Sequence, residues 1–132
     1  EMSISVQIVT PERPIYNGTC SEVRAPSALG EIGVMPGHRA LLAALDAGRV
    51  LVQAGNGDDI FAVSGGFIEV SDDSVTILAE HALAAADIDA AAAKTALGQA
   101  QESLKSLGPS DSGYAAAQAK ASWSRAQLLA KG

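Results

Sequence analysis

The chain has 132 residues, a formal net charge of −6 and a single cysteine. This length fits one domain, or a compact domain of about 80 residues with an appendage. Because an acidic chain repels phosphate backbones, its charge argues against nucleic-acid binding, and one cysteine excludes an intramolecular disulfide. No segment has the roughly 18 consecutive apolar residues of a membrane span, so we expect no direct membrane insertion.

The first part of the chain, residues 2–81, is rich in β-branched residues and is punctuated by Gly, Pro and Asn. Ile4, Val6 and Ile8 alternate with polar residues, the pattern of a strand with one buried face. Further extended stretches are expected at 16–25 (with a break at Asn17–Gly18), 30–35, 50–53, 60–63, 67–70 and 75–78. Short strands at a spacing of about ten residues predict a flattened antiparallel β-sandwich.

The second part of the chain predicts two helices. Residues 87–107 contain no proline and are dominated by helix-forming residues, with Asp87 as the expected N-cap. A Gly-Pro-Ser loop then separates this helix from a second one at 113–130, capped by Asp111 or Ser112. Because the loop is short, the two helices are expected to form an antiparallel α-helical hairpin.

The change of pattern predicts two domains, a β-sandwich at 1–84 and a helical hairpin at 85–132. The apolar stripes of the helices consist largely of alanine, which favours helix formation but buries little surface. The stripes therefore predict stable helices that attach weakly to each other. Two interpretations stay open at this point, a hairpin that can rearrange and a static one packed through small residues. Trp123 either packs within the chain or binds another protein.

Support for catalysis is scarce in the sequence. His38 and His81 are the only histidines, too few for the common multi-histidine metal sites. Neither a phosphate-binding glycine motif nor a Gly-x-Ser-x-Gly nucleophile elbow is present. Gly55–Asn56–Gly57 joins two expected strands, so we interpret it as a hairpin turn rather than a nucleotide loop. We therefore expect no catalytic residues, no metal site and no cofactor.

A dense cluster of glycines surrounds a short apolar stretch at residues 30–39. Three glycines and Pro36 bracket this stretch and force a sharp corner at each end. Glu31 is placed near one corner and His38–Arg39 just past the other. The segment is therefore either an exposed corner of the sandwich or a shaped loop that presents charge to a partner.

Several segments resemble the epsilon subunit of bacterial F-type ATP synthase, the counterpart of mitochondrial delta. They are 30–38 (GEIGVMPGH), 61–70 (FAVSGGFIEV) and 75–80 (VTILAE), and the opening stretches 6–12 and 15–18 also fit. The resemblance implies a sandwich of about ten strands followed by a helical hairpin. It implies a non-catalytic rotor subunit in the central stalk of a proton-translocating complex. The expected location is peripheral, on the cytoplasmic face of the bacterial inner membrane.

The resemblance also implies that the sandwich couples the gamma subunit to the c-ring. The residues that match the family's c-ring-facing turn are Ala28, Leu29, Gly30 and Glu31. The residues that match its gamma-facing segment are His38, Arg39, Ala40, Leu41 and Leu42. Glu31 is expected to meet basic side chains of the polar c-ring loops.

In this family the hairpin can extend toward the alpha and beta subunits and block rotation, and in some members the folded hairpin binds ATP. Ile88 and Asp89 match the start of the family's ATP motif, but Ala92 stands where that motif has arginine. Alanine cannot pair with phosphate, so we predict weak or absent ATP binding. Basic candidates for contact with the catalytic ring are Lys120, Arg125 and Lys131. The alternative functions are a free-standing ATP-sensing regulatory module and a hydrolase on a small β scaffold.

Overall fold

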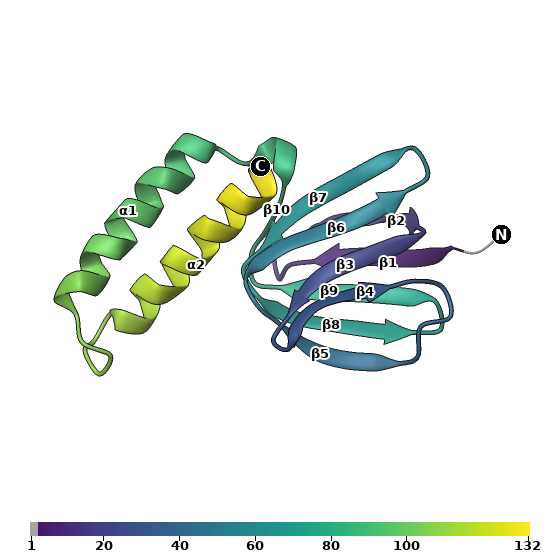
Figure 1. Cartoon of the computed structure of the whole chain (residues 1–132), viewed down its shortest axis with the longest axis horizontal. Coiled ribbons are helices and arrows are strands. Elements are labelled where there is room, and N and C mark those ends of the chain that lie inside the picture. The colour runs from purple at the N-terminus through teal and green to yellow at the C-terminus, as the bar shows by residue number, and fades with distance from the viewer. Residues whose placement is uncertain (1–2) are drawn as a thin grey trace.

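The computed structural model describes residues 3–132, so the first two residues of the predicted sandwich domain lie outside the described residues. Ten strands come first and two helices follow (Figure 1). The residue pattern predicts strands followed by two helices, and the number of strands is the one that the resemblance implies. The strands are β1 Ile4–Val9, β2 Pro14–Cys20, β3 Glu22–Ser27, β4 Gly30–Val34, β5 Leu41–Leu45, β6 Gly48–Ala54, β7 Gly57–Val63, β8 Gly66–Ser71, β9 Ser74–Ala79 and β10 Ala82–Ala84. A 3-10 turn η1, Ala85–Asp87, leads to α1, Ala90–Ser106, and α2, Tyr114–Lys131.

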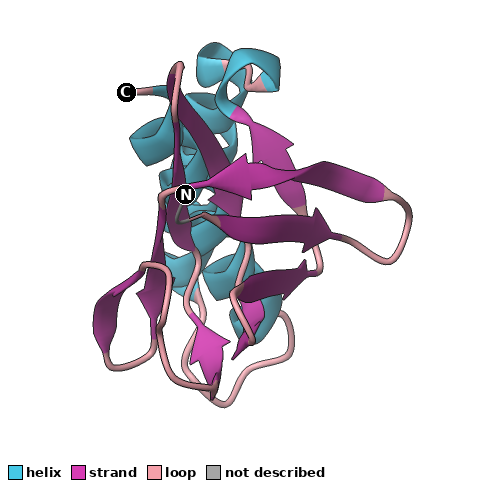
Figure 2. Ribbon diagram, turned by 90° about the vertical axis from the view of Figure 1, so that its right-hand side faces the viewer, coloured by secondary structure: helices cyan, strands magenta, loops and turns pink. Residues whose placement is uncertain are grey.

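The strands form two layers around one core. Hydrogen bonding runs in the order β10-β7-β6-β3-β5-β8-β9-β1-β2, with β4 added beside β3. The link between β3 and β5 is a single pair, Ser27 with Leu45, so the sheet folds over at that point. One layer is β10-β7-β6-β3-β4 and the other is β5-β8-β9-β1-β2, and both lie in front of the helices in Figure 2. Most pairings are antiparallel, but β1 and β9 run parallel.

Alternation along the strands places one set of side chains between the layers. In β1, Ile4, Val6 and Ile8 are buried while the polar residues between them face solvent, as the sequence pattern predicts. All the largest fully buried side chains of the described chain are Ile or Val of the strands. Burying each such side chain stabilises the fold by roughly 1.5–3 kcal/mol relative to exposure. The sandwich therefore has a branched aliphatic core.

Some local predictions were wrong. Asn17–Gly18 does not break a strand, because both residues keep their pairing with β1 and the break comes at Ser21. Helix α1 is capped by Asp89, not Asp87, since the Asp89 carboxylate accepts the Ala92 N–H at 3.0 Å. Helix α2 is preceded by Gly113 at φ 91°, which has no side-chain cap.

The two residues expected to cap α2 lie in the loop instead. The carboxylate of Asp111 accepts the Gly108 N–H at 2.7 Å, which closes the loop between the helices. Because Asp111 is used there, it is not available to the first turn of α2.

Helix α2 lies between α1 and the strands (Figure 1). Its main contacts in the sandwich are with β6 and β7, and it packs along α1 on its other side. The described helices bury mostly alanine: Ala93, Ala100, Ala117, Ala121, Ala126 and Ala130, with Ser124. The division at 84/85 follows the change from strands to helices, while independent folding of the two parts stays a prediction. No helix among residues 3–132 is long and apolar enough to cross a membrane.

Candidate interaction surface

The turn between β3 and β4 presents an apolar tip held by a buried serine. Ser27 is 6% exposed, and its hydroxyl donates to the Gly30 carbonyl at 2.5 Å and accepts the Leu29 N–H at 3.2 Å. Gly30 has φ 122°, a conformation that favours glycine. Leu29 at the tip is fully exposed, and Ala28 is tied to β5 through the Ala44 carbonyl. These hydrogen bonds hold the turn in one conformation, and it presents an apolar side chain at its tip.

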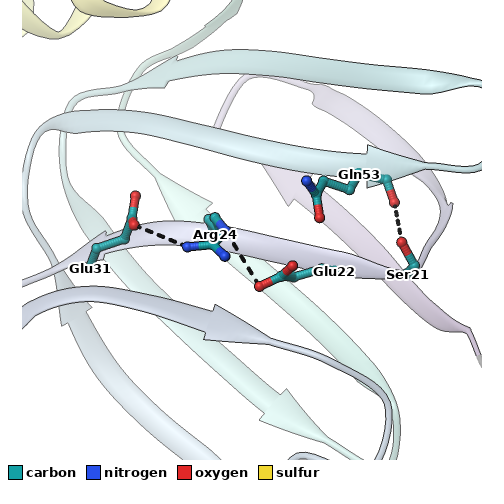
Figure 3. Close-up of polar contacts among 5 residues, drawn as sticks. All are labelled: Ser21, Glu22, Arg24, Glu31 and Gln53. Carbon is teal, nitrogen blue, oxygen red and sulfur yellow. Dashed lines mark hydrogen bonds and ion pairs between the residues drawn. The ribbon is translucent and has the colours of Figure 1, made fainter.

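Glu31 lies beside this turn on the surface, in a row of charged side chains with Arg24 and Glu22 (Figure 3). Its carboxylate is 3.5 Å from Nη1 of Arg24, whose Nε is 3.4 Å from the carboxylate of Glu22. The Glu31 side chain is 57% exposed, so the ion pair steers the carboxylate without shielding it from solvent. The sequence prediction that Glu31 sits at an accessible corner is confirmed.

The segment from His38 to Leu42 starts at the opposite end of β4. The His38 N–H donates to the Met35 carbonyl at 3.1 Å, which forms a turn, and Nδ1 of His38 lies 2.8 Å from the Arg39 carbonyl oxygen. Arg39 and Ala40 are exposed. Leu41 turns toward the core, whereas Leu42 is 72% exposed. The structure therefore places the two predicted contact regions at the two ends of one strand, as the two glycine-bounded corners predict.

Four apolar side chains form a row across the solvent-facing side of the second layer. The register aligns Ala44 with Phe67, Phe67 with Leu78, and Leu78 with Val9. Phe67 is 56% and Leu78 50% exposed. We call Val9, Ala44, Phe67 and Leu78 the outer apolar row. An apolar row on the solvent-facing side of a sheet makes this face a candidate interaction surface.

A groove deepens this row at one end. The groove has a volume of about 670 Å³, and its lining is partly apolar, with Phe67, Leu78, Pro11 and Leu45, and partly polar, with Thr10, Ser64 and Glu80. Leu42 is two residues from Ala44 on the same face of β5, which extends the apolar surface toward His38. The predicted gamma-facing segment and the outer apolar row therefore form one continuous surface.

The sequence prediction missed this row, although the alternation contains it. In β8, Ile68 and Val70 are buried and Glu69 is exposed, so Phe67 shares the outer face with Glu69. In β9, Ile77 is buried, so Leu78 faces outward. The sequence did contain a signal for this row: an apolar residue stands two positions from a polar residue on the outer face of its strand, as Phe67 does from Glu69.

Asp73 is a second missed residue. It lies in the two-residue β8–β9 turn, and its carboxylate accepts the Gly37 N–H at 2.8 Å. Asp72 and Asp73 both have positive φ, at 48° and 58°. The sequence identifies the turn but gives no sign that it holds the loop before His38.

Two groups of the described chain have perturbed acidity, and both belong to the core. Burial raises the pKa of the Cys20 thiol, which makes it a poor nucleophile. Burial, together with the neighbouring Asp59 carboxylate, raises the pKa of the Tyr16 hydroxyl. Residues 3–132 contain no group of three or more His, Cys, Asp or Glu side chains able to hold a metal ion. The features that stand out are therefore surfaces.

Comparison with known proteins identifies the family. Residues 3–85 match the model of the ATP synthase delta/epsilon chain β-sandwich domain. An ATP synthase epsilon chain of Nitrosococcus oceani is 45% identical over 131 residues, covering 98% of this chain and 92% of the relative. The chain belongs to the ATP synthase delta/epsilon family.

Other members extend this result. The epsilon chain of Anoxybacillus flavithermus is 46% identical over 103 residues, covering 78% of this chain and 77% of its own. Two solved structures share the fold. One is a Euglena gracilis mitochondrial ATP synthase assembly described as OSCP/F1/c-ring (TM-score 0.79, 24% identity, 93% of this chain and 78% of that one). The other is the central stalk and c-ring of Tetrahymena thermophila mitochondrial ATP synthase (TM-score 0.62, 19% identity, 98% and 96%).

Membership of the epsilon family makes this chain an accessory, non-catalytic subunit. The residues that match the ATP motif of some members have structural tasks here. Ile88 is 4% exposed and packs with Ala62, Ala126 and Ala130 beneath α2. Asp89 caps α1, and Ala92 offers no side-chain donor.

The basic residues of the hairpin lie apart from one another. Lys120 donates to Gln99 of α1 at 3.1 Å, and Lys131 donates to the Ala85 carbonyl at 3.1 Å. Arg125 lines a groove of about 340 Å³ between α2 and Asp46–Gly48. The structure therefore does not bring Lys120, Arg125 and Lys131 together into one basic patch.

Proposed function

We propose that this chain is an epsilon-type subunit of the central stalk of a proton-translocating F-type ATP synthase, where it couples gamma to the c-ring. The bacterial relatives support a location on the cytoplasmic face of the inner membrane, reached through partner subunits. The observation that carries the proposal is the outer apolar row on a stiff sandwich. A rotor subunit must transmit torque, which requires a rigid body with a sizeable grip on its neighbours.

The gamma surface is proposed to be the outer apolar row together with residues 38–42. A few side chains near the centre of an interface carry most of its binding energy, and Phe67 and Leu78 lie side by side at the centre of the row. The exposed Leu42 extends it, while Arg39 supplies a charge at its rim. This composition fits an apolar core with a polar rim.

The c-ring surface is proposed to be the β3–β4 turn. Leu29 offers an apolar tip and Glu31 a steered negative charge beside it. A basic side chain on a polar c-ring loop would pair with Glu31 at the edge of the contact. Charge pairs at a rim chiefly affect the rate of association and its salt dependence.

The hairpin is proposed to bind ATP weakly or not at all. The Asp89 carboxylate already accepts a helix N–H, Ile88 is buried, and Ala92 carries no phosphate-binding group. Titration calorimetry with Mg-ATP on the full chain tests this, and micromolar binding would favour the alternative of an ATP-sensing module.

Contact of Lys120, Arg125 and Lys131 with acidic segments of alpha and beta is likewise proposed. Two of these residues are engaged within the chain, so the hairpin would have to exchange those bonds for intersubunit ones. Deletion of residues 87–132 in the assembled enzyme tests the regulatory role. A rise in ATP hydrolysis supports inhibition by the hairpin, and unchanged hydrolysis contradicts it.

The central experiment measures the affinity of the chain for purified gamma. Phe67→Ser and Leu78→Ser should each weaken binding about tenfold or more, as expected for truncated hot-spot residues. Leu129→Ser is the matched control, because Leu129 is exposed to the same extent as Phe67, 56%, but lies on α2. Absence of gamma binding by the wild-type chain, or equal weakening by all three variants, would refute the proposed surface.

A further inference from the structure

The loop between β4 and β5, residues 35–40, contains the start of the proposed gamma surface. The loop lies between Val34, where β4 ends, and Leu41, where β5 begins. None of its residues is buried, and Met35 is 57% exposed. The His38 N–H bonds the Met35 carbonyl, which is a contact within the loop itself. Burial in the core therefore does not fix the conformation of this loop.

A side chain from a distant turn holds the backbone of the loop. The Asp73 carboxylate accepts the Gly37 N–H at 2.8 Å, and within residues 3–132 it is the only side chain from another element that hydrogen-bonds this loop. Gly37 directly precedes His38, the first residue of the predicted gamma-facing segment. The bond therefore fixes the backbone at the point where that segment begins.

The turn that carries Asp73 is itself firmly held. Strands β8 and β9 stay paired up to the turn, where Ser71 lies opposite Ser74. On the side of β1, the Asp73 carbonyl accepts the Ser5 N–H at 3.0 Å. Because β1, β8 and β9 together fix the Asp73 backbone, its carboxylate gives the loop a rigid point of attachment.

The turn itself does not favour aspartate at position 73. In a two-residue turn whose residues both have positive φ, glycine is the favoured second residue. Asp73 adopts φ 58°, a conformation that costs free energy for a residue with a Cβ and none for glycine. The conformation of the turn therefore does not account for the aspartate, whereas its bond to Gly37 does.

We propose that Asp73 is a positioning residue for the gamma contact, because it holds the β4–β5 loop in the binding conformation before gamma arrives. This inference rests on the proposed function, in which residues 38–42 contact gamma. A loop that is already ordered loses less conformational freedom on binding, so its affinity for the partner is higher. Removal of the Asp73 carboxylate therefore weakens gamma binding through the loop, without a contact between Asp73 and gamma.

The test measures two quantities on full-chain variants: the affinity for purified gamma, and the hydrogen-exchange rate of the Gly37 amide in the free chain. Asp73→Gly removes the carboxylate, and glycine adopts the same φ without strain. We expect gamma binding to weaken about three- to tenfold and Gly37 exchange to accelerate by a similar factor, the effect of losing one hydrogen bond. Asp73→Asn should restore most of both losses, because its amide oxygen accepts the same N–H.

Asp72→Gly is the matched control, since Asp72 lies in the same turn, has a positive φ of 48° and carries the same charge. Asp72 is exposed, and of the two carboxylates only that of Asp73 bonds the loop. Both the gamma affinity and the Gly37 exchange rate of Asp72→Gly should therefore match those of the wild type.

Four results would overturn the inference: wild-type affinity of Asp73→Gly, equal weakening by the two glycine variants, unchanged Gly37 exchange, or no recovery in Asp73→Asn. If the wild type still binds gamma and Phe67→Ser still weakens that binding, such a result leaves the proposed function standing. Absence of gamma binding by the wild type would refute both the proposed function and the inference.

Discussion

The sandwich and the hairpin are held together by different kinds of side chain. In the sandwich, Ile68 and Ile77 face each other across paired strands and are completely buried. In the hairpin, the corresponding positions are alanines such as Ala100 and Ala121. Because the free energy of burial scales with apolar area, each sandwich contact stabilises several times more than each hairpin contact. One chain thus contains a rigid sandwich, whose core is Ile and Val, and a more weakly attached hairpin, whose buried residues are mostly Ala.

The strongest test of this contrast is a core substitution. Ile77→Ala should lower the free energy of unfolding by roughly 2–5 kcal/mol, since it leaves a cavity among close-packed branched side chains. Ala121→Gly in the hairpin should cost only about 1 kcal/mol, chiefly through helix propensity. Urea denaturation followed by circular dichroism measures both. Equal losses at the two positions would contradict the contrast.

The next largest effect is expected at a glycine in the sheet. A Cβ on Gly66 would lie 1.9 Å from the Leu78 carbonyl oxygen, and φ is 138°. Gly66→Ala should therefore destabilise the sandwich by roughly 3 kcal/mol or more. At Gly55 the added Cβ meets nothing within 4 Å, so Gly55→Ala is the control and should be nearly neutral. Thermal unfolding of the two variants decides the matter.

Removing the hairpin sharpens the comparison and tests the predicted domain boundary. A fragment of residues 1–84 should fold, with a loss of about 1–2 kcal/mol as Ile60 and Ala62 lose their cover. The amide spectrum of the fragment should match that of the sandwich in the full chain. If the amide resonances of the fragment were poorly dispersed, the fragment would be unfolded, and the hairpin and the sandwich would fold as one cooperative unit.

A smaller effect is expected at the cap of α1. Asp89→Ala should cost about 1 kcal/mol, because the Ala92 N–H loses its acceptor. Asp87→Ala is the paired control and should change little, as Asp87 lies in the preceding 3-10 turn. Hydrogen exchange of the first turn of α1 measures the difference. Greater loss of protection in the Asp87 variant would contradict the assigned cap.

The smallest effect concerns alkaline pH. The raised pKa of Tyr16 means that the folded state favours the protonated hydroxyl over the phenolate. The stability that the protonated Tyr16 hydroxyl contributes is fully present below the pKa of an unfolded tyrosine. It is lost as the pH rises through the higher pKa of Tyr16 in the folded state. Tyr16→Phe should therefore flatten the decline in stability between about pH 9.5 and 11.5, near where a tyrosine titrates. Denaturation at several pH values checks the slope, and an unchanged decline would refute it.

The sequence predicts most of the strands because their alternation is set by one buried face. The residue pattern does not predict strand β5, because Leu41–Leu45 is a continuous apolar run in which no polar residues alternate with apolar ones. Strand β10 is only three residues long, too short for a period. Both depend on pairing partners far along the chain, with β8 and β7 respectively. Register of this kind is a tertiary property that local pattern does not encode.

The candidate surface was predicted only where the chain turns sharply. Glu31 and His38 were identified because glycines force corners beside them. The outer apolar row was missed because its members come from four strands, and their alignment depends on the same register. The Asp73–Gly37 bond joins residues 36 positions apart, and no local motif announces it. The proposed contacts with gamma, the c-ring and the catalytic ring remain predictions, because each of them involves a second protein.

The parallel pairing of β1 with β9 has a consequence for synthesis on the ribosome. Val6 lies beside Val75, so β1 stays without this neighbour until the polypeptide has grown past Ala79. Chains grow at roughly 5–20 residues per second, and long-range pairings are slow to close. The edge of β1 that pairs with β9 therefore stays open for several seconds, the stage at which a holding chaperone has most to protect.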